Sequence, residues 1–225
     1  IESFKTSKDI HVWLVPDKTV QAITIAFSVS GGAIMTADKA GVSGLTERML
    51  SKGSGPYTNH QFQELLEGLG IEMGAGFSAD FFSGSLRTTY DNRVEAFRLF
   101  KEYINHARFE SSEFELVRQE YLTYVQNAQK SPAYVLERMI AEKFFAKHPY
   151  GIPMEGTPES LKKLSIKDLK SYLTKHQMLA GLNVVVCGNL SVDETKKIID
   201  EIFGSWPVGE PYKGHTIDSL DLAGK

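Results

Sequence analysis

The sequence predicts an α+β fold in which a mostly antiparallel sheet carries helices packed on one face. Three observations predict it. Segments whose apolar residues alternate are joined by links short enough for hairpins, which favour antiparallel pairing. Segments with helical spacing open with capping residues. From residue 91 the chain is mainly helical, whereas a doubly wound fold would alternate strand and helix.

The composition is that of an ordinary globular protein. Of the 225 residues, 42% are hydrophobic and 24% are charged, which argues against disorder. The formal net charge of -3 implies no overall basic surface for nucleic acid. Apolar runs are all shorter than the 18 or so residues of a membrane-spanning helix, so no transmembrane segment is expected. The one cysteine, Cys187, lies in an apolar run and is expected to be a buried small hydrophobe.

Strands and two helices fill the first part of the chain. An apolar run over 12–16 and an alternating run over 20–29 predict two strands. Helical spacing follows over 40–52, and a second helix over 58–69 begins with a capping box. Two further strands are expected over 71–79 and 82–90, joined by a hairpin turn at 78–80.

Helices dominate the remainder. The stripe Val94, Phe97, Phe100 and Ile104 predicts a helix from residue 91. Further helices are expected from residues 112, 131, 157 and 165, then a buried strand over 182–188 and a last helix over 191–203. The helix from residue 112 is expected to hold one apolar face, formed by Phe114, Val117, Tyr121, Tyr124 and Val125. Residues 1–204 are expected to form one domain, and residues 205–225 a linker or tail.

Motif spacing alone assigns no reaction. The chain has six histidines, and no two of them lie three to five residues apart, so no helix presents a histidine pair to zinc. No glycine-rich loop ends in Gly-Lys-Ser/Thr, and there is no Gly-x-Ser-x-Gly elbow. The residues themselves therefore indicate an α+β domain and nothing more.

Several segments, however, resemble the insulinase/pitrilysin family of zinc peptidases. They are the glycine pair 31–32, the helical run 40–54, the turn 148–151, the run 156–159 and the strand 182–190. Mitochondrial processing peptidase and the core subunits of respiratory complex III belong to this family. The pieces follow the family's order from about residue 4 to 207. The resemblance implies one half-domain of the insulinase/pitrilysin fold, with 205–225 leading toward a second half-domain.

The resemblance also locates a degenerate zinc motif. The family's His-x-x-Glu-His places its first histidine on Gly44, its glutamate on Glu47 and its second histidine on Arg48, and the third ligand falls on Tyr124. Glycine has no side chain and arginine cannot coordinate a cation, so no metal, no other cofactor and no catalytic residue are expected. Glu47 is a vestigial general base, read as an ordinary solvated or arginine-paired glutamate. Arg48 is expected to be an internal strut toward the Tyr124 hydroxyl or a neighbouring carboxylate.

The resemblance implies a non-catalytic subunit that pairs, as a heterodimer, with a zinc-bearing paralogue or a second half-domain to form a peptide-binding chamber. The alternative is a purely structural subunit of a larger complex, as in complex III core proteins; an active peptidase with a relocated metal site is the least favoured. Unfolded peptide would add to the sheet edge at Gly74, Ala75, Gly76 and Phe77, and Gly76→Pro is expected to weaken that binding. A bacterial periplasmic location is favoured, with the mitochondrial matrix as the alternative.

Overall fold

The computed structural model describes residues 1–146 and 148–214. The strands are β1 (Glu2–Lys5), β2 (His11–Pro16), β3 (Ala22–Ser30), β4 (Glu72–Phe77), β5 (Phe81–Thr89) and β6 (Leu182–Gly188). The helices are α1 (Val42–Leu50), α2 (Asn59–Leu69), α3 (Arg93–Asn105), α4 (Ser111–Ala128), α5 (Pro132–Phe144), α6 (Pro158–Lys163), α7 (Ile166–His176) and α8 (Val192–Phe203). Two short 3-10 helices are η1 (Ala33–Lys39) and η2 (Pro149–Gly151).

The strands form one six-stranded sheet in the order β1-β2-β6-β3-β5-β4. Only the β2–β6 pair is parallel among the strand pairs of the described chain. The mostly antiparallel α+β fold is therefore confirmed. The expected hairpin turn is present, since the backbone N–H of Ser78 donates to the carbonyl of Phe81 at 2.9 Å. Strand β4 forms one edge of the sheet, and that edge matters below.

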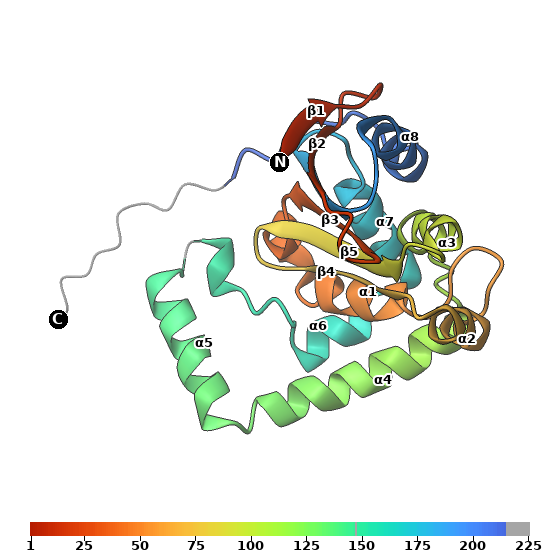
Figure 1. Cartoon of the computed structure of the whole chain (residues 1–225). Helices are drawn as coiled ribbons and strands as arrows, with labels where there is room; N and C mark the ends of the chain where they lie inside the picture. The colour runs from red at the N-terminus through yellow and green to blue at the C-terminus, as the bar shows by residue number, and fades with distance from the viewer. Residues whose placement is uncertain (147, 215–225) are drawn as a thin grey trace.

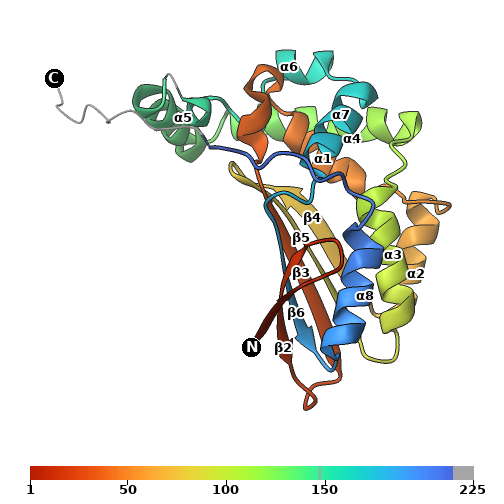
Figure 2. The same cartoon turned by 90° about the horizontal axis from the view of Figure 1, so that it is seen from above.

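Helices cover one face of the sheet. Figure 2 shows α2, α3 and α8 along this face, while α1 contacts β4, α4 and α7. Alternation along β3 directs Ile23, Ile25, Phe27 and Val29 into the core beneath these helices. The expected packing of helices on one face is confirmed.

The other face of the sheet carries no helix of the described residues (Figure 2), and this corrects one expectation. Along β6, Leu182, Val184 and Val186 are buried, whereas Val185 is 43% exposed. Cys187 shares the face of Val185 and is exposed. The apolar run predicts a strand that is buried on both sides, but only its alternate residues meet the helices.

One strand was not predicted, and two further expectations were wrong. Strand β1 was not foreseen, because its residues are mostly exposed and show no apolar alternation. Val94 was placed on the apolar stripe of α3, yet it is 72% exposed, whereas Phe97, Phe100 and Ile104 are buried. In the same way Tyr124 is 54% exposed, although Phe114, Val117, Tyr121 and Val125 are buried on α4 as expected. These two side chains lie at the margin of their helical faces.

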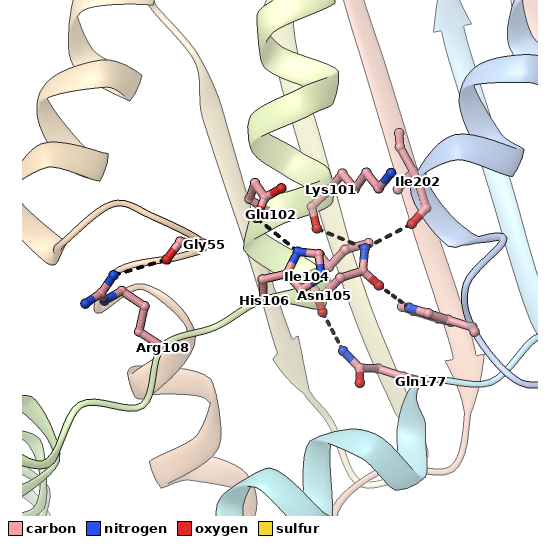
Figure 3. Close-up of polar contacts among 10 residues, drawn as sticks. Gly55, Lys101, Glu102, Ile104, Asn105, His106, Arg108, Gln177 and Ile202 are labelled. Atoms are coloured by element: carbon pink, nitrogen blue, oxygen red, sulfur yellow. Dashed lines mark hydrogen bonds and ion pairs between the residues drawn. The ribbon is translucent and has the colours of Figure 1, made fainter.

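Polar contacts join the end of α3 to the end of α8 (Figure 3). The Asn105 amide donates to the carbonyl of Ile202 at 3.0 Å and accepts from Trp206 Nε1 at 2.6 Å. Gln177 donates to the carbonyl of Ile104 at 2.5 Å, which ties the end of α7 to the same place. Trp206 is buried against Phe27 and Phe203, so the chain packs on the domain just beyond α8. The boundary between 1–204 and 205–225 stays a prediction, and residues 215–225 lie outside the described ones.

Candidate functional site

Gly44, Glu47 and Arg48, on which the resemblance places the His-x-x-Glu-His motif, lie on α1, a short helix between α4, α7 and strand β4. Tyr124 lies on α4. Helix α1 starts at Gly41, whose φ of 91° is in the left-handed region that favours glycine. Val42, Leu45 and Met49 face the core. Gly44 and Arg48 are four residues apart, so they share the face that meets α4.

Arg48 links α1 to α4 through aromatic rings. Its Cζ atom lies 4.5 Å from the ring centroid of Tyr121 and 5.3 Å from that of Tyr124. The two rings are stacked, with centroids 5.7 Å apart and planes inclined by 6°. A guanidinium over such a ring face is held by the ring quadrupole. The side chain is thus the expected strut between the two helices, but it contacts ring faces in place of a tyrosine hydroxyl or a carboxylate.

Tyr121 fills the space beside Gly44. A Cβ atom added at Gly44 would overlap the Tyr121 hydroxyl, so any side chain at position 44 would require the tyrosine to move. The Tyr121 side chain is buried, and burial raises the pKa of its phenol, while Arg48 acts in the opposite direction. The hydroxyl therefore stays neutral at physiological pH, and a neutral phenol is a poor metal ligand.

The donor set of this site does not fit a zinc ion. Of Gly44, Glu47, Arg48 and Tyr124, only Glu47 supplies a good zinc-binding donor, and the guanidinium of Arg48 would repel a cation. Across residues 1–146 and 148–214, no group of three or more His, Cys, Asp and Glu side chains is arranged to hold a metal. No metal-dependent step can be assigned to these residues.

Glu47 reaches the edge of the sheet. Its Oε2 accepts a hydrogen bond from the backbone N–H of Phe77 at 3.4 Å. A Cβ atom added at Gly76 would lie 2.8 Å from this carboxylate, so the glycine provides the room in which Glu47 crosses the edge. Glu47 is exposed, but its partner is a strand backbone and not an arginine.

The segment expected to bind peptide is strand β4, at the edge of the sheet. Ser78 and Phe81 form a hydrogen-bonded pair. Hydrogen-bonded and non-hydrogen-bonded pairs alternate along an antiparallel ladder, so the backbone N–H groups of Gly76 and Gly74 point toward β5. Among the four residues expected to bind peptide, Ala75 and Phe77 have the outward N–H groups. Ala75 donates to the Tyr103 hydroxyl at 3.2 Å, as Phe77 donates to Glu47. Burial raises the pKa of Tyr103 to about 12.

This geometry corrects the expected effect of Gly76→Pro. The N–H of Gly76 points into the sheet, so its loss would weaken the β4–β5 ladder and not an outward contact. Sequence reasoning also missed Tyr103 as a neighbour of the edge and Tyr121 as the group opposite Gly44. One feature of the sequence could have indicated both contacts: each tyrosine lies on an apolar helical face, and a buried tyrosine hydroxyl needs a hydrogen-bond partner.

Comparisons with known proteins identify the family of the chain. Residues 11–158 match the family model described as insulinase (peptidase family M16). The non-peptidase homolog YmxG of Helicobacter pylori is 25% identical over 199 residues, which cover 88% of this chain and 46% of that protein. The chain spans about half the length of the curated relatives it matches.

Solved structures show the same fold. A peptidase M16 inactive domain from Pseudomonas fluorescens is similar with a TM-score of 0.88 at 20% identity, covering 97% of this chain and 53% of that chain. The first half of the periplasmic protease PqqL from Escherichia coli is similar with a TM-score of 0.79 at 14% identity, covering 97% of this chain and 48% of that one. The likeness is thus to one half of larger molecules.

No helix in residues 1–146 or 148–214 has the length and apolar character needed to cross a membrane.

Proposed function

This chain belongs to the insulinase family, peptidase family M16, and we propose that it is a non-catalytic half-domain of that family. It pairs with a zinc-bearing family member or a second half-domain, and it contributes one wall of a chamber for unfolded peptide. Its relatives include a non-peptidase homolog and an inactive domain, which supports the non-catalytic assignment.

One observation carries the proposal. The Tyr121 phenol stands against Gly44, and the Arg48 guanidinium stacks on the same ring. A phenol and a permanent cation thus lie where the family resemblance places two zinc ligands. A general base at Glu47 would have no metal-bound water to activate. Its carboxylate instead holds the edge of β4.

Peptide binding at β4 is part of the proposal. A peptide added to this edge would hydrogen-bond to the outward N–H groups of Ala75 and Phe77. The Tyr103 hydroxyl and the Glu47 carboxylate now accept from these groups, so both would have to move aside. The same contacts favour the second candidate, a purely structural subunit, in which the edge stays closed.

A reconstituted peptidase assay tests the proposal. The purified chain is mixed with the family member of the same organism that carries an intact His-x-x-Glu-His motif. We expect a complex that cleaves unfolded peptide, while this chain alone does not. The complex should still cleave peptide when this chain carries Glu47→Gln, whereas the equivalent substitution in the partner should abolish cleavage.

Two outcomes would contradict the proposal. Cleavage by the isolated chain that is lost in Glu47→Gln would make it an enzyme. A stable complex whose cleavage and peptide affinity equal those of the partner alone would favour the structural candidate.

A further inference from the structure

Side chains from two helices occupy the edge of β4, where a further strand would pair. The outward N–H groups of an antiparallel edge strand donate to carbonyl oxygens when another strand is added. Here the N–H of Ala75 donates to the Tyr103 hydroxyl at 3.2 Å, and that of Phe77 donates to the Glu47 carboxylate at 3.4 Å. Figure 1 shows α1, which carries Glu47, beside β4. Two side-chain oxygens therefore take the place of two carbonyl oxygens of an incoming strand.

These two acceptors differ in how easily they can leave the edge. Tyr103 is 4% exposed, so its hydroxyl is held in place by the core around its ring. The Glu47 side chain is exposed, and its hydrogen bond to Phe77 lies at the surface. The backbone of α1 is fixed, because Leu45 and Met49 are buried. Rotation of the Glu47 side chain alone is therefore enough to uncover the N–H of Phe77.

Gly76 leaves the space that the Glu47 carboxylate needs. The φ of Gly76 lies outside the left-handed region, so its backbone does not require glycine. A Cβ atom at this position would lie 2.8 Å from the carboxylate, whereas one at Gly74, on the same face of β4, would meet nothing within 4 Å. The missing side chain at position 76 thus lets Glu47 reach the N–H of Phe77.

We propose that Glu47 is a removable cap, which closes the β4 edge in the free chain and moves aside when peptide binds. Its gating of peptide rests on the proposed function, since it regulates the site proposed there. A peptide gains its bond to the N–H of Phe77 only after Glu47 has released that group, so the cap lowers the apparent affinity. The cap also protects the edge from pairing with the strands of other chains, a hazard of exposed edge strands.

Amide hydrogen exchange, followed residue by residue by NMR, tests the cap in the free chain. Gly76→Ala places a methyl group where the carboxylate lies and should displace it. The amide of Phe77 should then exchange about fivefold faster, the worth of one hydrogen bond. Gly74→Ala is the matched control, because its methyl group meets nothing, and Phe77 should exchange at the wild-type rate. Equal exchange of Phe77 in both variants and the wild type would show that Glu47 does not cap this group.

Substitutions at Glu47 separate the reach of the side chain from its charge. Glu47→Asp keeps the charge but is one methylene shorter, whereas Glu47→Gln keeps the length and an acceptor oxygen but is neutral. Fluorescence anisotropy with a labelled unstructured peptide measures the affinity. Glu47→Asp and Glu47→Ala should both raise it by about fivefold, and Glu47→Gln should stay near the wild type. Glu120→Ala, which removes an exposed glutamate of α4, is the control and should bind as the wild type does.

The contrary results overturn different claims. If Glu47→Gln behaves like Glu47→Ala while Glu47→Asp behaves like the wild type, the charge acts and the cap is wrong. If Glu47→Ala lowers the affinity, Glu47 contacts the peptide; the cap is then wrong, and peptide binding at β4 stands. If Phe77 exchanges as expected but no variant binds peptide, Glu47 only closes the edge, and its gating role falls together with the proposed peptide binding.

Discussion

Arg48 is a charged side chain held mainly by two aromatic rings. It is half-buried, and its guanidinium lies within 5.3 Å of the ring centroids of Tyr121 and Tyr124. The long stem of the arginine covers part of the interface between α1 and α4. At this scale the site is a packing contact, and its energetics are those of cation–π stacking and buried apolar area.

Replacing Arg48 should therefore cost stability. Arg48→Ala removes the stacking and the stem, so we expect the free energy of unfolding to fall by about 1–2 kcal/mol, which lowers the melting midpoint by roughly 2–8 °C. Arg87→Ala is the matched control, because its side chain is 66% exposed and its ion pair with Glu72 spans 3.8 Å. An Arg48→Ala variant that melts with the wild type would remove Arg48 from the interface.

Rebuilding the zinc motif requires a fourth change. Gly44→His, Arg48→His and Tyr124→Glu restore three ligand types, yet the new imidazole at position 44 would collide with the Tyr121 hydroxyl. The triple variant should bind zinc weakly, and adding Tyr121→Ala should raise its affinity. Isothermal titration with zinc compares the two variants. Equal affinities would show that Tyr121 does not occupy the ligand position.

The buried histidine should make the protein acid-sensitive. His176 is fully buried, with Nδ1 at 2.7 Å from the carbonyl of Tyr172 and Nε2 at 3.2 Å from that of Gly32. Burial lowers the pKa of His176, so the unfolded chain binds its proton more readily than the folded one. The free energy of unfolding should then fall as the pH drops below about 6.5, the ordinary value for histidine.

Denaturant titrations between pH 8 and pH 5 measure this slope. His176→Gln should flatten it, because glutamine does not titrate. His60→Gln is the control, since that side chain is 81% exposed and should leave the slope as it is. A wild-type stability that stays constant down to pH 5 would contradict the argument.

At the scale of elements, local patterns predicted most of the fold. Capping boxes at Thr58, Ser165 and Ser191 are present, because each depends only on residues three apart. Strand β1 and the exposure of Cys187 escaped prediction, since both depend on which strands and helices become neighbours. Periodicity defines an apolar face but not what it meets.

Strand β4 supplies a test of the edge. Ala75→Pro removes one outward N–H while proline remains acceptable on an edge strand, so peptide affinity should fall by about fivefold, the worth of one hydrogen bond. Gly76→Pro should instead lower the melting midpoint, because its N–H faces β5. Fluorescence anisotropy of a labelled unstructured peptide measures the affinity. Equal affinity for the wild type and Ala75→Pro would move the binding site away from β4.

At the scale of the whole molecule, family resemblance carried what residues alone could not. No recognisable motif is formed by Gly44, Glu47, Arg48 and Tyr124 themselves. They stand out only by comparison with the family, whose zinc ligands they do not retain. In the structure, Arg48 stacks on the ring of Tyr121. The Tyr121 ring packs against Gly44 and Arg48, the two positions on which the resemblance places histidine ligands.

Zinc content tests the central claim most directly. The purified chain is dialysed against a weak chelator and analysed for metal, with the zinc-bearing family member of the same organism treated in parallel. We expect no stoichiometric zinc in this chain and retained zinc in the other protein. About one zinc ion per chain, retained through dialysis, would contradict the account, because Gly44, Arg48 and Tyr124 supply no adequate ligand set.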